Sequence, residues 1–396
     1  MEKRIVVTGI GVVSSNAGNE KELIEALEEL KEGQSEVDLY STDGLVSRLG
    51  CEIKRPLRYE DECDERTTAV AFEAIDDLYK DQSLRDMIAE NSEDVVFSFA
   101  TSMAGNQNMM RYVNSDTPES DEDFVYIVPD FINKISSKLG VNGPVYTTMS
   151  ACAAGTAAAG IAFDAIKSGE TDVAIVGGTD ALTLFSSVGF SALKAIAEDK
   201  CRPFDQERSG INLGEASAFI VLEELDHAVA RGADIYAEVA GYAAKNEAYH
   251  ITSPRPDGEG AYIAMKEALE DAEINITDEN VYVNAHGTGT KANDTMEIKG
   301  IEKLFPDQPN IYVSSTKAIT GHCLGAAGSI ELAISALALK HQFMPGTFRL
   351  DNPLETEGGI HILGAETVHR PVDYVISNSF AFAGNTASIV LRKYAG

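Results

Sequence analysis

Short apolar segments that favour β-strands alternate along this chain with segments that favour α-helices, and the alternation occurs twice. Strands are predicted at residues 5–8, 95–100, 145–149, 173–176, 216–222 and 235–244, and again at 281–284, 311–314, 374–377 and 388–391. Helices are predicted between them at residues 21–31, 66–81, 130–139, 153–166, 260–272, 293–305 and 329–340. Such alternation favours a mainly parallel sheet with helices on its faces. We therefore expect an α/β protein built from two similar halves, residues 1–245 and residues 246–396.

The composition limits the partners and the location of the protein. Its 396 residues carry a formal net charge of −31, which repels nucleic acid and anionic membrane surfaces. No apolar run approaches the length of a membrane span, and the N-terminus lacks the apolar stretch of a signal peptide. The five cysteines contain no CxxC pair, so neither a zinc site nor a disulfide framework is predicted. These features favour the reducing cytoplasm.

The candidate nucleophile is Cys152, which lies in Ser-Ala-Cys-Ala-Ala-Gly at 150–155 between a predicted strand and a predicted helix. The positive end of a helix dipole favours a thiolate. The unpaired backbone N–H groups of the first helical turn can also bind an oxyanion formed on an attached thioester. A lone cysteine is more often a small buried hydrophobic residue. Two histidine turns later in the chain favour the catalytic interpretation.

Each of these turns directly follows a predicted strand. His286 lies in Asn-Ala-His-Gly-Thr-Gly-Thr at 284–290, and His322 ends a run that also holds Lys317. Open α/β sheets bind ligands at the carboxyl ends of their strands. A cysteine with two histidines and a lysine suggests acyl-thioester chemistry, in which a thiolate attacks an acyl donor and imidazoles stabilise an enolate. The short ligand spacing typical of a metal site is absent, so no metal is predicted.

A glycine-rich run at residues 8–14 begins like a dinucleotide-binding fingerprint. Its third glycine is missing, since Ser14 occupies that position, and no helix is predicted to begin there. Binding of a nicotinamide or flavin cofactor is therefore not predicted.

Taken together, these motifs make the chain similar to the β-ketoacyl-[acyl carrier protein] synthases of the chain-elongating kind, the synthase I/II group and its type II polyketide relatives. The resemblance covers essentially the whole length. Its motifs are Ser-Ala-Cys at 150–152, Cys-Arg-Pro-Phe-Asp at 201–205, Tyr-His-Ile-Thr-Ser-Pro at 249–254, the two histidine turns, Gly-Ala-Ala-Gly at 325–328 and Asn-Ser-Phe at 378–380. The resemblance implies the thiolase fold, five αβαβα layers built from two similar βα halves. It also implies a dimer, formed either with a second copy or with a related ketosynthase-like subunit.

The resemblance assigns the central chemistry to four residues. Cys152 is expected to accept the acyl chain from the phosphopantetheine thioester of an acyl carrier protein, with the backbone N–H groups of Cys152 and Phe382 as oxyanion hole. His286 and His322 are expected to hold the malonyl thioester, promote its decarboxylation and stabilise the resulting enolate. Phe382 is expected to act as a gate between acyl loading and condensation.

Further residues are expected to support this chemistry. Lys317 is implied to order the site through a pair with Glu331. The residues expected to bind the phosphopantetheine arm are Thr288, Thr290, Thr252 and Ser253. The arm arrives on the carrier protein, so no cofactor of the enzyme itself is implied.

The implied activity is a decarboxylating Claisen condensation of an acyl-enzyme thioester with malonyl-[acyl carrier protein]. The product is a β-ketoacyl-[acyl carrier protein] two carbons longer, in fatty acid or in type II polyketide or polyene biosynthesis. Thiolases share the fold but use a second cysteine near the C-terminus, where this chain has none. Two alternatives are a length-determining or scaffold subunit, which typically lacks the nucleophile, and a primer-loading acyltransferase that never condenses. The presence of Cys152 and of both histidines argues against them.

The chain departs from the family pattern in its gate and in its charge. Where the family usually has Gly-Phe-Gly-Gly-Thr-Asn, this chain has Ala-Phe-Ala-Gly-Asn-Thr at 381–386, and the added Cβ atoms are expected to stiffen the loop. The regions that usually dock an acidic carrier are themselves acidic, at 60–65 and 118–123. We therefore expect a specialised carrier, or a partner subunit that supplies the basic surface. The candidate carrier contacts are Arg55, Arg58, Lys134, Lys138 and Arg202.

Overall fold

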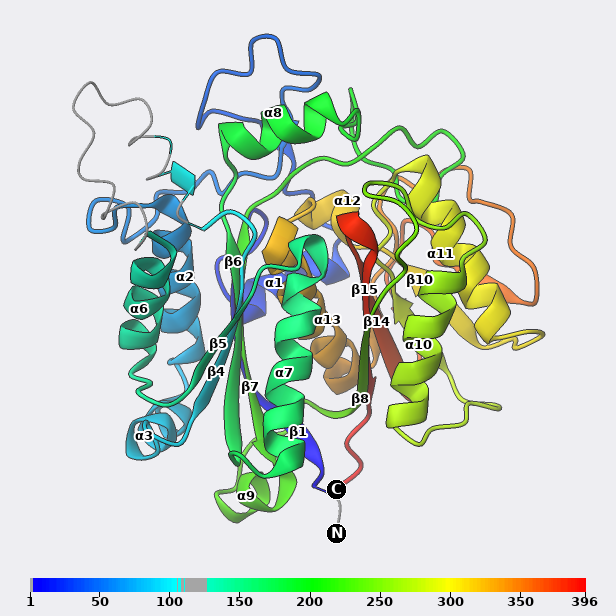
Figure 1. Ribbon diagram of the computed structural model, residues 1–396. Coiled ribbons are helices and arrows are strands. Elements are labelled where there is room, and N and C mark those ends of the chain that lie inside the picture. The colour runs from blue at the N-terminus through cyan, green and yellow to red at the C-terminus, as the bar shows by residue number, and fades with distance from the viewer. Residues whose placement is uncertain (1–2, 105, 108–109, 111–126) are drawn as a thin grey trace.

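The computed structural model describes residues 3–104, 106–107, 110 and 127–396 (Figure 1). The strands of its main sheet are β1 (Ile5–Ser14), β4 (Val96–Ala100), β5 (Val145–Thr148), β6 (Val173–Asp180), β7 (Ala216–Glu224), β8 (Ala237–Asn246), β9 (Val281–Asn284), β10 (Ile311–Ser314), β12 (Ile360–Ile362), β14 (Tyr374–Phe380) and β15 (Asn385–Arg392). Two short pairs lie apart from it, β2 (Ser35–Glu36) with β3 (Leu49–Gly50) and β11 (Phe343–Met344) with β13 (Val368–His369).

The α-helices are α1 (Glu20–Glu28), α2 (Arg66–Leu78), α3 (Gln82–Glu90), α6 (Ile127–Leu139), α7 (Ala154–Ser168), α8 (Leu184–Ala192), α9 (Leu225–Ala230), α10 (Glu259–Asp271), α11 (Lys291–Leu304), α12 (Lys317–Thr320) and α13 (Ala327–His341). Three 3₁₀ turns are η1 (Ala151–Ala153), η2 (Leu324–Ala326) and η3 (Phe382–Gly384). No helix among the described residues is long and apolar enough to cross a membrane.

The strand order of the main sheet is β12-β10-β9-β14-β15-β8-β1-β7-β6-β4-β5. The prediction of a mainly parallel sheet is wrong, because the sheet is mixed. β4, β5 and β6 are parallel to one another, as are β9, β10, β12 and β14, while β7, β1, β8 and β15 pair antiparallel. The turn from β14 to β15 is too short for a helical crossover, and such a connection permits only antiparallel pairing.

The same arrangement of strands occurs twice. The first series has the order β1-β7-β6-β4-β5, and the second has β8-β15-β14-β9-β10 with the same sense at every pairing. The series join where β1 pairs with β8 over three residues. Two similar βα halves are therefore present, while the boundary between residues 245 and 246 stays a prediction.

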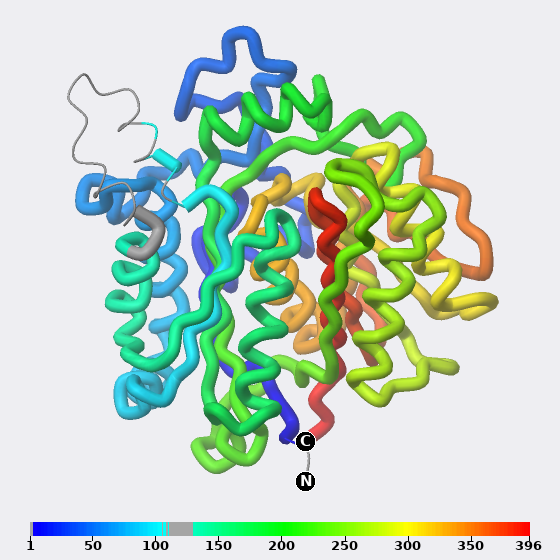
Figure 2. Tube along the Cα trace, viewed as in Figure 1, coloured from blue at the N-terminus to red at the C-terminus, as the bar shows by residue number. Residues whose placement is uncertain are grey.

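The elements stack in five layers. Helices α2 and α6 cover one side of the first series, α10 and α11 cover the far side of the second, and α7 and α13 lie between the two series (Figures 1 and 2). Residues Ala327 to Leu339 of α13 are all buried, as expected for a helix enclosed on every side. The predicted αβαβα architecture is confirmed.

The glycine-rich run at residues 8–14 belongs to β1 and serves packing. A Cβ at Gly11 would collide with the backbone oxygen of Ala74 and the backbone nitrogen of Leu78, both on α2. Glycine at this position lets α2 lie directly against the strand.

Candidate active site

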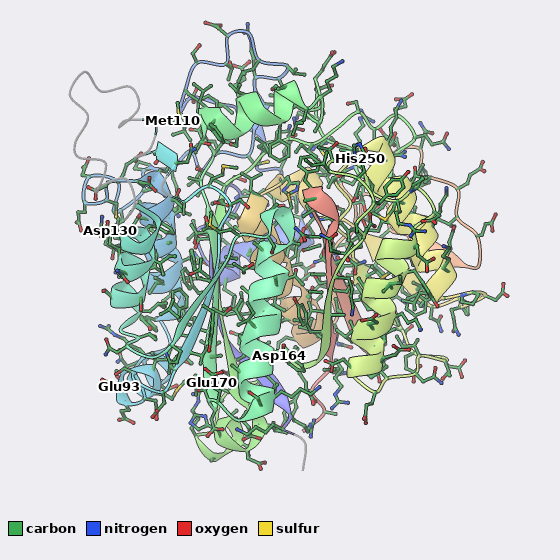
Figure 3. All side chains as sticks on the ribbon, viewed as in Figure 1. Glu93, Met110, Asp130, Asp164, Glu170 and His250 are labelled. Carbon is green, nitrogen blue, oxygen red and sulfur yellow. The ribbon has the colours of Figure 1, made fainter. Side chains whose placement is uncertain are left out.

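Turns that follow several strands of the sheet surround one cavity of about 400 Å³. Cys152, His286 and His322 line it and are 7%, 2% and 3% exposed. The other predicted site residues that line it are Phe382, Thr288, Thr290, Thr252 and Ser253. His250, which also lines the cavity, lies in the upper part of the molecule, the part that carries α8 (Figure 3).

Close contact between the first turns of α7 and α13 brings the cysteine and histidine turns together. A Cβ on Gly155 of α7 would lie 2.8 Å from the Cα of Gly328 on α13. Real Cβ atoms do not approach backbone this closely, so the contact depends on glycine. Cys152 lies just before Gly155, and His322 lies shortly before Gly328. The Gly-Ala-Ala-Gly run therefore has a packing role at the site.

Cys152 lies in η1, directly ahead of α7, as the sequence predicted. The preceding residue, Ala151, has a φ of 51°, which makes the tight strand-to-helix turn. Burial raises the pKa of the Cys152 thiol to about 12, against the opposing charge of Lys317. The helix end favours the thiolate, but desolvation of the charged form is the larger effect.

His322 has a defined tautomer. Its Nδ1 accepts a hydrogen bond from the backbone N–H of Leu324 at 3.1 Å, so the neutral ring carries its proton on Nε2. Burial, with the nearby charge of Lys317, lowers the pKa of His322 to about 3. At neutral pH this imidazole is uncharged and presents an Nε2–H donor.

His286 is held by a carboxylate in the middle of the following helix, α11. Its backbone N–H and that of Gly287 donate to Glu297 at 2.9 and 2.8 Å. Burial lowers the pKa of His286 well below its usual value, helped by the charge of Lys317. The rings of His286 and His322 meet edge to face with centroids 5.4 Å apart. The cavity thus holds two neutral imidazoles near one thiol.

Lys317 and Glu331 form an ion pair behind the cavity, as the sequence predicted. Each side chain is 2% exposed, and Lys317 begins α12 while Glu331 lies in α13. Burial raises the pKa of the Glu331 carboxyl, and the lysine opposes that rise. The lysine ties α12 to α13 and acts on Cys152 and both histidines through its charge.

Phe382 lies in η3 and closes one side of the cavity by stacking on Phe190, with ring centroids 5.7 Å apart. The two alanines of this loop that replace family glycines, Ala381 and Ala383, differ in backbone strain. Ala383 has a φ of 62°, a region that favours glycine, whereas Ala381 has an ordinary extended conformation. The Ala383 N–H donates to the backbone oxygen of Ile251 at 2.8 Å, which fixes this loop to the neighbouring one.

The predicted arm-binding residues are held in two hydrogen-bonded turns. Thr288 and Thr290 join their hydroxyls at 2.9 Å, and Thr290 also caps the start of α11. The backbone N–H groups of Thr252 and Ser253 both donate to Nδ1 of His250 at 3.1 Å.

The predicted carrier contacts do not line the catalytic cavity, and each pairs with a carboxylate. The pairs are Arg55–Glu73, Arg58–Asp76, Lys134 with Asp64 and Asp130, Lys138–Asp76 and Arg202–Asp351. The acidic segment at 118–123 lies outside the described residues.

Two buried carboxylates were missed by the sequence analysis. Glu297 supports the His286 turn, and burial raises its pKa to about 7. Asp180, at the end of β6, accepts hydrogen bonds from the Thr101 hydroxyl and from the backbone N–H groups of Ser102, Met103 and Gly325, at 2.6 to 2.8 Å. The position of Glu297 in the first turns of the helix after His286 was a usable signal, whereas nothing local marks Asp180.

No group of three or more His, Cys, Asp or Glu side chains in the described part of the chain could hold a metal ion.

Comparison with known proteins identifies the family. The family model described as the N-terminal domain of β-ketoacyl synthase matches residues 2–228, and its C-terminal counterpart matches residues 236–351. The chain belongs to the β-ketoacyl synthase family. This synthase is 35% identical to 3-oxoacyl-[acyl-carrier-protein] synthase 2 of Staphylococcus aureus strain COL, over 99% of both chains.

Solved structures agree with the sequence comparison. The synthase superposes with a TM-score of 0.90 and 28% identity on a structure of a type II PKS acyl-carrier protein in complex with its ketosynthase, over 100% of both chains. It superposes on the ishigamide ketosynthase/chain length factor with a TM-score of 0.88 and 29% identity, again over 100% of both chains. These ketosynthases confirm the thiolase fold that the resemblance implied.

Proposed function

We propose that this synthase extends an acyl chain by two carbons, through decarboxylating condensation with a malonyl group carried by an acyl carrier protein. The observation that carries the proposal is the convergence of a buried thiol with two neutral imidazoles in one cavity. Neutral imidazoles that donate hydrogen bonds suit an enolate, whose negative charge develops on a thioester oxygen.

Loading transfers the acyl group to Cys152. The Cys152 sulfur forms a bond to the acyl carbonyl carbon, the bond from that carbon to the carrier sulfur breaks, and the carrier leaves as a thiol. The proton of the Cys152 thiol passes to the leaving sulfur, so no net charge is created. Backbone N–H groups at η1 and at Phe382 are the proposed donors to the tetrahedral oxyanion.

Condensation begins with the malonyl thioester held by His286 and His322. The bond to its carboxylate breaks, CO₂ leaves, and the electron pair forms an enolate whose oxygen accepts the Nε2–H of His322. The enolate carbon attacks the acyl-Cys152 carbonyl, and the Cys152 thiolate leaves and takes up one proton. Burial keeps both histidines neutral, and the charge of Lys317 behind them adds to the effect because it disfavours a second cation nearby.

The proposal includes a partner subunit. Strand β5 is the edge of the main sheet, and its Val145 and Tyr146 are 40% and 39% exposed. An open edge with apolar side chains favours association with another chain. We assign this edge to a second ketosynthase-like subunit, since the ishigamide relative is a ketosynthase with a chain length factor. A cytoplasmic location suits a substrate delivered by carrier proteins.

The test separates the two half-reactions with His322→Ala and His286→Ala variants. Acylation of Cys152 by an acyl carrier thioester is followed by intact mass, and decarboxylation by release of CO₂ from a malonyl carrier thioester. We expect decarboxylation to fall by about 100-fold or more, the usual effect of removing one oxyanion donor, while Cys152 is still acylated. Unchanged decarboxylation in both variants would remove the basis of the proposal.

A further inference from the structure

Two lysines line the mouth of the catalytic cavity without an acidic partner. Lys194 follows α8, and Lys291 is the first residue of α11. Both side chains are exposed and both line the cavity. Within the described ranges, neither side chain makes an ion pair or a hydrogen bond.

This lack of partners contrasts with the cations predicted to dock the carrier. In a chain of net charge −31, each of those five side chains pairs with a carboxylate, and Asp76 pairs with both Arg58 and Lys138. A cation that remains unpaired beside a ligand cavity is available to an anionic group of the ligand. The two unpaired lysines at the cavity mouth are therefore separate from the predicted docking residues, none of which lines the cavity.

The chain from His286 to Lys291 runs from the depth of the cavity to its rim. His286 is 2% exposed and Thr288 is 6% exposed, Thr290 is partly exposed, and Lys291 is exposed. A ligand with its thioester at His286 and its arm along the threonines ends beside Lys291. The first turn of α11 adds the positive end of a 14-residue helix at the same place.

We infer that Lys194 and Lys291 bind the phosphodiester of the phosphopantetheine arm at the cavity mouth. The inference rests on the proposed function, because that function brings the arm into the cavity. The phosphodiester carries the negative charge of the arm at the end that joins the carrier. Recognition of the carrier thus depends on its arm more than on its acidic surface, which the acidic face of this chain repels.

The experiment compares hexanoyl thioesters of 4′-phosphopantetheine and of pantetheine, which differ only in the phosphate. The rate of Cys152 acylation below saturation is measured by intact mass for each donor, and the ratio of the two rates is the readout. We expect the ratio to fall by about threefold in Lys194→Gln or Lys291→Gln and by about tenfold in the double variant, as for loss of exposed charge pairs. Lys393→Gln, an exposed lysine outside the cavity, is the matched control and should keep the wild-type ratio.

Two results would overturn the inference. One is a double variant that keeps the wild-type preference for the phosphorylated donor. The other is a double variant impaired with a hexanoyl carrier protein but not with hexanoyl-phosphopantetheine, which would assign the lysines to the acidic surface of the carrier. Failure of both thioesters to acylate Cys152 in the wild-type protein, even at high concentration, would instead contradict the proposed function and this inference with it.

Discussion

At the scale of single residues, the reactivity of Cys152 depends on two opposing effects. Its position ahead of α7 and the charge of Lys317 favour the thiolate, whereas complete burial disfavours it and raises the thiol pKa to about 12. The resting enzyme then holds a protonated thiol. We infer that the proton leaves only as the acyl donor binds, which protects the thiol from unspecific alkylation.

The first prediction follows from this raised pKa. Because the thiolate fraction increases with pH as long as pH stays below the pKa, the rate of Cys152 alkylation by iodoacetamide should increase by about tenfold per unit between pH 7 and pH 9. Peptide mass spectrometry measures the rate at this residue, and Cys152→Ala gives the background from the half-buried Cys63. A rate that is already constant above pH 7 would mean that the helix end outweighs burial.

At the scale of secondary-structure elements, η3 shows how one methyl group can strain the gate. Ala383 has a φ of 62°, where an L-residue is disfavoured by about 1 kcal/mol, while Ala381 is extended with a φ of −132°. Both positions replace glycines of the family pattern, so strain is expected at only one of them.

The second prediction uses this difference. Ala383→Gly should raise the free energy of unfolding by roughly 0.5 kcal/mol, since relief of strain exceeds the entropy cost of glycine. Ala381→Gly should lower it by roughly 0.5–1 kcal/mol, because the entropy cost is not offset. Urea unfolding of the two variants measures both changes. Equal destabilisation by the two glycines would show that Ala383 is not strained.

The third prediction concerns the turn that holds His322. Asp180 links the loop after β4 to Gly325, and the preceding Leu324 sets the His322 tautomer. Asp180→Asn turns an amide NH₂ toward backbone donors and should cost about 3 kcal/mol of stability. It should also slow decarboxylation relative to Cys152 acylation by roughly tenfold or more, because the histidine donor is displaced.

The matched control is Asp205→Asn. Asp205 is equally buried and accepts three backbone hydrogen bonds, but none of them comes from the turn that holds His322. The Asp205→Asn variant should lose a comparable free energy of unfolding. The ratio of the decarboxylation rate to the rate of Cys152 acylation should not change. If both variants shift that ratio alike, Asp180 is structural and does not position His322.

Predictability from sequence differs between elements for physical reasons. The bounds of β9 and β10 were predicted correctly, because a short apolar run ends at a polar turn in each. β1 was predicted too short, since Gly9 and Gly11 resemble loop residues until their packing against α2 is known. Helices α3, α8 and α9 were missed because they have only 9, 9 and 6 residues, which is too short for a helical period to stand out in the sequence.

In the site as well, residues with a local sequence signal could be predicted, and residues that depend on their surroundings could not. Cys152, His286, His322 and Lys317 lie in turns whose residue types reveal their chemistry, and the structure brings all of them to one cavity or directly behind it. Asp180 and the unpaired Lys194 become visible only in three dimensions, because their importance lies in what surrounds them. The resting charge of Cys152 was also out of reach, since it depends on burial.

At the scale of the whole molecule, two surfaces are the proposed sites of assembly. Edge strand β5 exposes Val145 and Tyr146, five or six residues ahead of the first residue of η1, so an interface there lies close in sequence to Cys152. The mouth of the cavity exposes Lys194 and Lys291 on an otherwise acidic protein. The first surface suits a related subunit and the second suits the arm of a carrier protein.

The fourth prediction tests the edge strand. Val145→Lys places a charge on the exposed edge and should shift the protein from dimer to monomer in sedimentation velocity, because a charged edge resists strand pairing. Val229→Lys, at an exposed apolar residue of α9, is the control and should leave the assembly unchanged. A variant at Val145 that sediments as the wild type would place the interface elsewhere.

The measurement that tests the central claim most directly is reconstitution of the condensation, followed by mass spectrometry. The protein and its Cys152→Ala variant each receive a medium-chain acyl carrier thioester and a malonyl carrier thioester. We predict a β-ketoacyl carrier product two carbons longer with the wild type, with a partner subunit added if required, and none with the variant. Product formed equally by the variant, or a wild-type Cys152 that is never acylated, would contradict the claim that this cysteine is the nucleophile of a condensing enzyme.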